Sequence, residues 1–453
     1  MLKLFMLYTR NLLSNMQYHF RTLNYLGSKL RLLNFIEENV RKITPDGAGV
    51  CDLFAGSGCV SYCLSRLYPV VACDIQAYSA TICNALLQKD DLDLPTIESI
   101  ICATKSDEAS KLQKCFASLI ELEENAIANK DLITLTDILE HGSVEAYDLA
   151  DGKSSLTSLL VQACKNLRDS NLWNEKSLIS RYYGGVFFSY RQAVYMDILL
   201  DIINKKENAK YKDTLLAALL STASDMVDTV GKHFAQPIKA RDSKGKIKAT
   251  VYNKAVKDKT IDAVSLYKEW LLKYIALPKG DFDNTAVQSD FMQCLQTLPD
   301  SVKTVYADPP YTRDHYSRFY HVLETMVLRD SPELSTVNIH GVTQISNGLY
   351  RKDRHQSPFC IRSQAPEAFR DMFRIVADTG RNLLLSYSPY DETKKTHPRV
   401  VTMQQLISLA KEHFANVDVI SAGQFTHNKL NSTEHFLEAS DEAEMLIVCT
   451  NNK

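Results

Sequence analysis

Residues 47–66 read GAGVCDLFAGSGCVSYCLSR, and this stretch decides the fold. An apolar run ends in an acid, Asp52, and is followed by a glycine loop and then by apolar residues at helical spacing. The segment YPVVACD at 68–74 repeats the pattern and ends in Asp74, about 20 residues after the first acid, as in nucleotide-binding α/β sheets. The stretch therefore predicts a β-loop-α-β unit.

Strand patterns return only late in the chain. Residues from about 92 to 280 are dominated by long helical stretches, whereas apolar strand-like runs recur from residue 285 onward. We therefore expect a doubly wound α/β sheet domain built from residues 20–90 and 281–453, with a mainly helical insert at 91–280. The polar stretch 331–358 lacks periodicity and is predicted to be a long loop or a small subdomain.

Composition narrows the class of protein. The 453 residues carry 52 Lys and Arg against 54 Asp and Glu, so any polyanion must meet a local basic patch. Eleven cysteines, an odd number without a Cys-x2-Cys pair, argue against a disulfide framework and a structural zinc site. No apolar run reaches the length of about 18 residues that a membrane-spanning helix needs, so no membrane span is predicted. A protein of the reducing cytoplasm, with no metal, is the expectation.

Three acids are predicted at strand ends, where open α/β sheets bind ligands. Gly56 and Gly58 let the backbone turn sharply and approach a ligand, although a plain tight turn explains them equally well. Asp74 can accept hydrogen bonds from two ribose hydroxyls or cap the next helix. Asp290 ends TAVQSD and can accept from an adenine amine, or it too caps a helix.

The segment YADPPY at 306–311 carries the most specific chemistry. The Asp308 carboxylate and the Pro309 carbonyl are acceptors that can hold both hydrogens of an amino group, and Tyr311 offers a face on which a base can stack. An aromatic amine is a poor nucleophile because its lone pair is delocalised. Two fixed acceptors favour the pyramidal geometry that frees this lone pair for attack on an electrophilic methyl group. The consecutive prolines stiffen the backbone that presents the acceptors.

DPPY at 308–311, together with DLFAGSG at 52–58 and NYLGSK at 24–29, resembles the D12 class of S-adenosylmethionine-dependent DNA adenine-N6 methyltransferases, the Dam-like group. The resemblance covers residues 25–87 and 286–448 and reaches RYYGGVFFSYRQA and HFAQP in the insert. It implies a Rossmann-like methyltransferase sheet and an inserted target-recognition domain. The insert is much longer than a minimal recognition domain of this class, so base-reading residues are not carried over.

The resemblance also implies a role for each motif residue. Lys29 would pair with the cofactor carboxylate, Asp74 would take the ribose hydroxyls, and Asp290 with Phe291 would recognise the cofactor adenine. The target adenine would be held after leaving the duplex stack. The implied cofactor-binding residues are Tyr25, Gly27, Lys29, Asp52, Phe54, Gly56, Gly58, Asp74, Asp290 and Phe291, and the implied catalytic residues are Asp308, Pro309, Pro310 and Tyr311.

A local basic patch is predicted to meet nucleic acid. Nine basic residues and two acids occur between Lys232 and Lys259, around a DSKG turn. Either a β-hairpin carries these side chains to phosphates or the segment is a solvated loop. SRYYGGVFFSYRQ at 180–192 is either a stacking surface or a buried aromatic cluster. The candidate nucleic-acid contacts are Lys232, Lys239, Arg241, Lys244, Lys246 and Lys248.

The sequence thus predicts methyl transfer from S-adenosylmethionine to adenine N6 in double-stranded DNA. RNA adenine and the N4 amine of cytosine remain alternative substrates, because the same acceptors suit either amine. A non-catalytic binding protein of the same fold is a further alternative, and so are partner subunits of a restriction or defence system.

Overall fold

The computed structural model describes residues 20–147, 155–313, 315–339, 341–388, 399–421 and 444–452. These residues divide into two compact units. The sheet unit contains the described residues up to 89, 276–317 and those from 355 onward, and the helical unit contains 90–275 and 318–354. Residues 318–354, which the sequence assigned to the sheet domain, therefore belong to the helical unit.

The described part of the sheet unit forms a seven-stranded sheet in the order β3-β2-β1-β4-β7-β9-β8. Strands β1 to β4 and β7 pair in parallel, and β9 runs antiparallel to both β7 and β8. The strands are β1 (Gly49–Asp52), β2 (Val70–Asp74), β3 (Thr285–Gln288), β4 (Val302–Ala307), β7 (Asn382–Tyr387), β8 (Phe414–Ser421) and β9 (Met445–Asn452).

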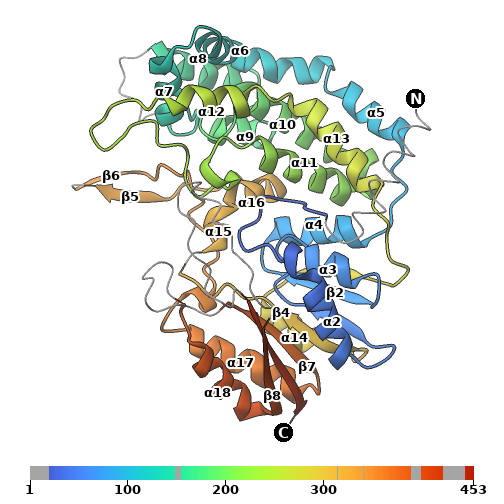
Figure 1. The fold of residues 1–453 in the computed structure, drawn as a ribbon. Helices are drawn as coiled ribbons and strands as arrows, with labels where there is room; N and C mark the ends of the chain where they lie inside the picture. The colour runs from blue at the N-terminus through green and yellow to red at the C-terminus, as the bar shows by residue number, and fades with distance from the viewer. Residues whose placement is uncertain are drawn as a thin grey trace. The chain divides into compact units, whose positions relative to one another are not determined.

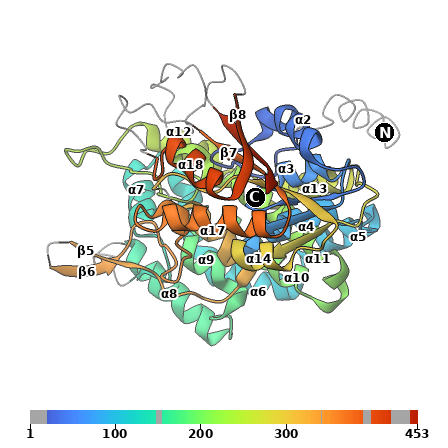
Figure 2. The same ribbon diagram turned by 90° about the horizontal axis from the view of Figure 1, so that it is seen from below.

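Both faces of this sheet are covered by helices, so its central strands are mostly apolar and buried. Val50 joins a core cluster with α2 and α3, whereas its neighbour Cys51 joins one with α14, α17 and α18. Figures 1 and 2 show α17 and α18 together beside β7 and β8. The helices are α2 (Leu33–Ile43), α3 (Cys59–Leu64), α4 (Ala77–Leu87), α14 (Phe291–Thr297), α17 (Ala365–Asp378) and α18 (Met403–His413), with 3-10 turns η1 (Leu30–Leu32) and η6 (Pro358–Cys360).

The order of the strands reverses between β1 and β4. These strands lie side by side although about 250 residues separate them, and Asp52 is in register with Tyr306. In open α/β sheets, a ligand binds where the strand order reverses, beyond the carboxyl ends of the strands. The fold therefore brings Asp52 and Asp308 to one ligand-binding crevice.

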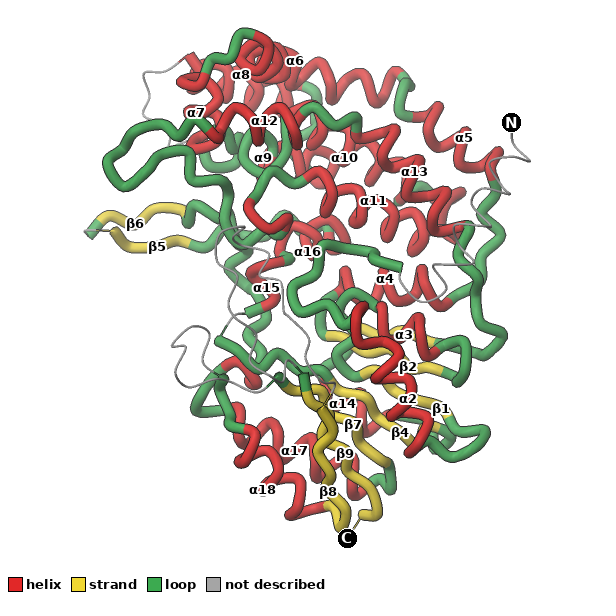
Figure 3. Tube along the Cα trace, in the orientation of Figure 1, coloured by secondary structure: helices red, strands yellow, loops and turns green. Residues whose placement is uncertain are grey.

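The helical unit is built around α10 and α11, whose side chains are buried on almost every face. Figure 3 shows this unit as mainly helix, with long loops and the two-stranded hairpin β5–β6, which occupies part of the predicted loop or small subdomain at 331–358. Its helices and strands are α5 (Leu94–Ala103), α6 (Asp107–Ala128), α7 (Leu132–His141), α8 (Ser155–Asp169), α9 (Leu178–Tyr183), α10 (Tyr190–Ile203), α11 (Lys212–Met226), α12 (Thr250–Lys259), α13 (Ala263–Ile275), α16 (His321–Leu328), β5 (Thr336–Ile339) and β6 (Val342–Ile345), with 3-10 turns η3 (Glu175–Ser177), η4 (Lys206–Tyr211) and η5 (Val230–Lys232). The short helix α15 (Tyr316–Phe319) lies where the chain passes from one unit to the other.

Among the described residues, no helix has the length and apolar character needed to cross a membrane.

Candidate active site

A pocket of the sheet unit lies at the carboxyl ends of β1, β2 and β4. It is lined by all the predicted cofactor-binding and catalytic residues except Gly58, which ends the glycine loop and caps α3. The predicted residues that line it are Tyr25, Gly27, Lys29, Asp52, Phe54, Gly56, Asp74, Asp290, Phe291, Asp308, Pro309, Pro310 and Tyr311.

The glycine loop requires glycine at two positions. Gly56 has φ of +53°, and a Cβ atom there would lie 2.7 Å from the Tyr25 hydroxyl oxygen. Gly58 has φ of +74°, and a Cβ atom there would lie 2.7 Å from Leu86 Cδ1. Both positions combine a left-handed backbone with a close neighbour, so a larger residue would displace the loop. The loop is a tight turn and a wall of the pocket at once.

Asp52 is a buried acid at the end of β1 with one oxygen unused. Its Oδ2 accepts a hydrogen bond from the Ser61 hydroxyl at 2.5 Å, whereas Oδ1 is buried and has no hydrogen-bond partner among the described residues. Burial raises the pKa of Asp52 to about 7, and the nearby charges of Asp308 and Asp74 add to the rise. A buried acceptor without a hydrogen-bond partner costs free energy of folding. Such acceptors are typical of sites that bind a donor group of a ligand.

Asp74 and Asp290, the other two strand-end acids, line the pocket and also accept hydrogen bonds from the local backbone. Asp74 accepts hydrogen bonds from the backbone N–H groups of Gly56 and Gln76, both at 2.9 Å, and so ties the glycine loop to the start of α4. Burial raises the pKa of Asp74, although these two backbone donors oppose the rise. Asp290 accepts from the Met292 N–H at 2.9 Å and caps α14. The helix-capping alternative is thus realised at Asp290.

Three phenylalanine rings form an apolar wall beside these acids. Phe54 and Phe291 lie 6.2 Å apart between ring centroids, and Phe359 meets both edge-on at 5.3 and 5.0 Å. All three rings line the pocket. A wall of this kind, next to acceptors, suits a flat heterocycle with amino hydrogens.

Asp308 is paired with Lys29 in the pocket. The Lys29 ammonium lies 3.1 Å from Asp308 Oδ1 and 3.0 Å from Glu444 Oε1. Burial raises the pKa of Asp308 to about 6, with Lys29 opposing the rise and Glu444 adding to it. Burial alone would lower the pKa of Lys29, but Asp308 and Glu444 outweigh it and hold that pKa well above the ordinary value. Lys29 therefore stays charged between two carboxylates.

Tyr311 is held in a defined position next to this pair. Its ring lies 4.9 Å from the Tyr387 ring, with the Arg399 guanidinium 4.7 Å from its centroid. The ring also packs against the core beneath β4 and β7. A ring fixed in this way presents a surface with little conformational freedom left to lose on binding.

The sequence missed several residues of this site. Phe359 and His355 both line the pocket, and burial lowers the pKa of His355 despite the nearby charges of Asp290 and Asp74. Glu444 and Phe359 lie outside the recognised motifs, and no local pattern marks them. Each reaches the site because its strand or turn returns to the sheet edge.

The basic segment of the helical unit is less uniform than predicted. Its turn at 242–245 carries Lys244 and Lys246 on the surface, and Arg241 and Ile247 form a single antiparallel bridge rather than a regular hairpin. The Lys232 ammonium bonds to Asp258 at 2.7 Å and to two backbone carbonyls, and Arg241 pairs with Glu140. The Lys248 ammonium bonds to the Lys239 carbonyl. Lys239, Arg241, Lys244 and Lys246 are exposed, and of these Arg241 is paired with Glu140.

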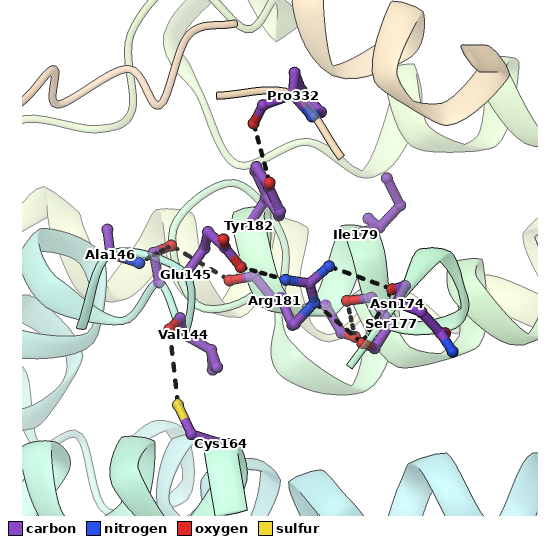
Figure 4. A network of polar contacts seen from close by, with 12 residues as sticks. Val144, Glu145, Ala146, Cys164, Asn174, Ser177, Ile179, Arg181, Tyr182 and Pro332 are labelled. Carbon is purple, nitrogen blue, oxygen red and sulfur yellow. Dashed lines mark hydrogen bonds and ion pairs between the residues drawn. The ribbon is translucent and has the colours of Figure 1, made fainter. Parts of the chain in front are cut away.

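The segment 180–192 is a buried cluster, which settles its two alternatives. Arg181 is 2% exposed and pairs with Glu145 (Figure 4). Its guanidinium lies 4.7 Å from the centroid of the Trp173 ring and 5.4 Å from that of the Tyr182 ring. The Tyr182 hydroxyl in turn donates to the Pro332 carbonyl at 3.0 Å. This arginine is used within the helical unit and is not a phosphate contact.

Comparison with known proteins agrees with this geometry. Residues 25–166 match the family described as D12 class N6 adenine-specific DNA methyltransferase. Modification methylase LlaI of Lactococcus lactis subsp. lactis is 24% identical over 86% of this chain, and Type II methyltransferase M.FokI of Planomicrobium okeanokoites is 22% identical over 81%. The chain spans about half the length of these two relatives (48% and 44%). Type II methyltransferase M.CviAII of Paramecium bursaria Chlorella virus 1 is 22% identical over 81% of this chain and 83% of its own length.

The strand-end acids, the glycine loop and the DPPY segment thus meet in one pocket, in a chain whose similarity to modification methylases extends over most of its length. The family resemblance predicted from the motifs is confirmed: residues 25–166 carry the signature of the D12 class of N6 adenine-specific DNA methyltransferases.

Proposed function

We propose that this chain transfers a methyl group from S-adenosylmethionine to the exocyclic N6 of an adenine in double-stranded DNA. The observation that carries the proposal is the meeting of Asp308 and Pro309 with the cofactor-binding motifs in a single pocket at the reversal of strand order. The family match and the relatives named as methyltransferases support it.

The residues of the pocket fit the cofactor. The unpaired Asp52 Oδ1 suits an ammonium or hydroxyl donor, Asp74 at the glycine loop suits the ribose, and the Phe54, Phe291 and Phe359 rings suit an adenine. The positive-φ turn at Gly56 opens backbone surface that a side chain would fill. When bound, S-adenosylmethionine supplies an electrophilic methyl group on a sulfonium sulfur.

The chain's own residues position the nucleophile. The Asp308 carboxylate and the Pro309 carbonyl would accept the two N6 hydrogens, and Tyr311 would stack on the base removed from the duplex. Fixed acceptors aimed at these hydrogens stabilise the positive charge that develops on N6. Loss of such a preorganised group typically lowers the rate by about 10²–10³-fold.

DNA contact is assigned to one side of the helical unit. A groove there is lined by residues 236–241 and by Val337 and Gln344 of the β5–β6 hairpin. Figures 1 and 2 show the hairpin and the loop before α12 projecting on the same side of this unit. Lys239, Lys244 and Lys246 would contact phosphates, and a two-stranded ribbon has the width that enters a major groove.

The first experiment identifies the product. The protein is incubated with unmethylated DNA and methyl-labelled S-adenosylmethionine, the DNA is digested, and the labelled nucleoside is identified. Label in N6-methyladenosine is expected, and it should fall at least 100-fold in Asp308→Ala. Asp418→Ala, at an exposed acid on β8, is the matched control and should retain activity. Label in N4-methylcytosine, or on RNA alone, would contradict the proposed substrate.

The relatives that are named as modification methylases suggest the biological role. We propose that the chain modifies sites that a separate endonuclease partner of a restriction-modification system would otherwise cut. We propose that the chain works in the reducing cytoplasm, where its eleven cysteines, all free in the structure, would stay reduced.

A further inference from the structure

A buried glutamate outside every recognised motif contacts the partner of the DPPY acid. Glu444 immediately precedes β9 and is 1% exposed. Its Oε1 accepts from the Lys29 ammonium at 3.0 Å and from the Ser386 hydroxyl of β7 at 2.6 Å. Asp308, Lys29, Glu444 and Ser386 therefore form a continuous chain of polar contacts.

Glu444 does not line the pocket, whereas Lys29 and Asp308 do. The Lys29 ammonium is its link to the pocket, since Lys29 is 4% exposed and touches both acids at nearly equal distances. Glu444 therefore reaches the pocket by contact through Lys29, and its charge also raises the pKa of Asp308 directly. Glu444 is therefore placed to position another residue of the pocket rather than to touch a ligand itself.

A single ammonium shared by two carboxylates divides its attraction between them. If Lys29 faced Asp308 alone, its full charge would draw the carboxylate's electron density and weaken the oxygens as acceptors for an amine hydrogen. Glu444 draws part of that charge to the opposite side. Asp308 then remains ionised beside a cation and keeps acceptor strength for the substrate.

We propose that Glu444, fixed by Ser386, is a positioning residue that holds Lys29 between two carboxylates and so tunes Asp308 as an acceptor for the target amine. This inference rests on the proposed function and deepens it. Its electrostatic surroundings are defined, because the charged and titratable groups acting on or next to Asp308 are Lys29, Glu444, Asp52, Tyr306 and Tyr311.

The test begins with Glu444→Gln, whose amide oxygen can still accept from Lys29 but carries no charge. Lys29 then turns its full charge on Asp308, so kcat should fall about tenfold while the KM for S-adenosylmethionine stays within about twofold. Since the Glu444 charge raises the pKa of Asp308 and Lys29 lowers it, the acid limb of the kcat profile should move to lower pH in Glu444→Gln. It should move to higher pH in Lys29→Met.

The double variant shows whether Glu444 acts through Lys29. In the Lys29→Met background, Glu444→Gln should cost little further activity, because the residue that carries its effect is gone. Glu123→Gln is the matched control, since Glu123 forms an equally buried pair with Lys259 at 2.8 Å in the helical unit. It should move neither kcat nor the pH profile, and circular dichroism should show each variant folded.

A second readout needs no turnover. With S-adenosylhomocysteine bound, the affinity for a duplex carrying adenine at the target position is compared with one carrying purine, which lacks the amine. The wild type should prefer adenine above the pKa of Asp308, and Glu444→Gln should weaken this preference at neutral pH. Additive single effects, an unmoved acid limb or an unchanged preference would overturn the role of Glu444. Absence of any methylation by the wild type would instead refute the proposed function, before any variant is compared.

Discussion

Removal of the Asp52 charge should stabilise the cofactor-free protein in a strongly pH-dependent way. The carboxylate is 1% exposed, and only one of its oxygens has a hydrogen-bond partner among the described residues. Asp52→Asn keeps the size of the side chain, and its carbonyl oxygen can still accept from Ser61. The substitution therefore isolates the cost of the buried charge.

The magnitude follows from the pKa of Asp52, which burial raises from 3.8 to about 7. Such a rise corresponds to about 4 kcal/mol of destabilisation once pH exceeds the folded-state value. The sign is that of a group with a raised pKa: the cost is absent below about pH 4, grows as pH rises and is complete above about pH 7. At pH 5 it amounts to less than about 2 kcal/mol.

The assay compares Asp52→Asn with the wild type at pH 5 and pH 8. The difference in the free energy of unfolding between the variant and the wild type should grow by about 3 kcal/mol from pH 5 to pH 8. This growth does not depend on which hydrogen bonds the new amide forms, because the amide does not titrate. Hydrogen exchange of peptides from β1 and β4 is the appropriate measure, because the two tryptophans, Trp173 and Trp270, both lie in the helical unit. Tryptophan fluorescence then serves as an internal control that should not change.

The same variant should bind S-adenosylmethionine at least tenfold more weakly, since the unpaired acceptor is lost. The substitution would thus raise the stability of the protein and lower its affinity for the cofactor, because both depend on Asp52 Oδ1. An advantage that is equal at both pH values, or that shrinks at pH 8, would refute the assignment of Asp52 as a buried charge awaiting a donor.

Three further results are expected. Gly58→Ala should destabilise the sheet unit by about 2–4 kcal/mol in urea unfolding, because it combines left-handed strain with a clash at Leu86; an unchanged midpoint would contradict this. Phe359→Ala should weaken S-adenosylhomocysteine binding about tenfold in calorimetry, because the ligand would bury less apolar surface. An unchanged affinity would show that Phe359 does not contact the adenine. Charge reversal of Lys244 and Lys246 should reduce the slope of log affinity for DNA against log salt concentration by about two. The same charge reversal at two exposed lysines of α6 (111 and 114) should leave this slope unchanged.

The positions of the strand-end acids were predictable, because they depend on local sequence. Asp52, Asp74 and Asp308 each follow an apolar run directly, so the end of a strand and the position of an acid can be read together. Parallel strands then place these ends on the same edge of the sheet. The order of the strands, by contrast, depends on pairings between segments up to hundreds of residues apart, and it was not predicted.

Residues 318–354 show the limit of this approach. From residue 331 the stretch is polar and weakly periodic, and nothing in it indicated the hairpin or that the whole stretch would belong to the helical unit. The Tyr182–Pro332 hydrogen bond and the ion pair between Arg351 and Asp330 help to hold them there. Such contacts between distant segments have no signature in local composition. The sequence left the segment around Arg181 open between a stacking surface and a buried cluster for the same reason.

The charges of the pocket explain why its acids are poorly neutralised by the protein alone. Asp52 and Glu444 are buried and Asp308 is partly buried, and the Lys29 ammonium contacts only Asp308 and Glu444 of these three acids. Acidic groups therefore outnumber the one ammonium paired with them. A fold selected for stability alone would replace such groups with apolar ones, because a buried uncompensated charge is costly. The proposed ligands carry what is missing: a sulfonium, an ammonium, ribose hydroxyls and an amine that becomes positive as it reacts. The excess of acceptors is therefore better explained by binding and catalysis than by folding, and it is strongest at Asp52 and Asp308, where the raised pKa values show the cost.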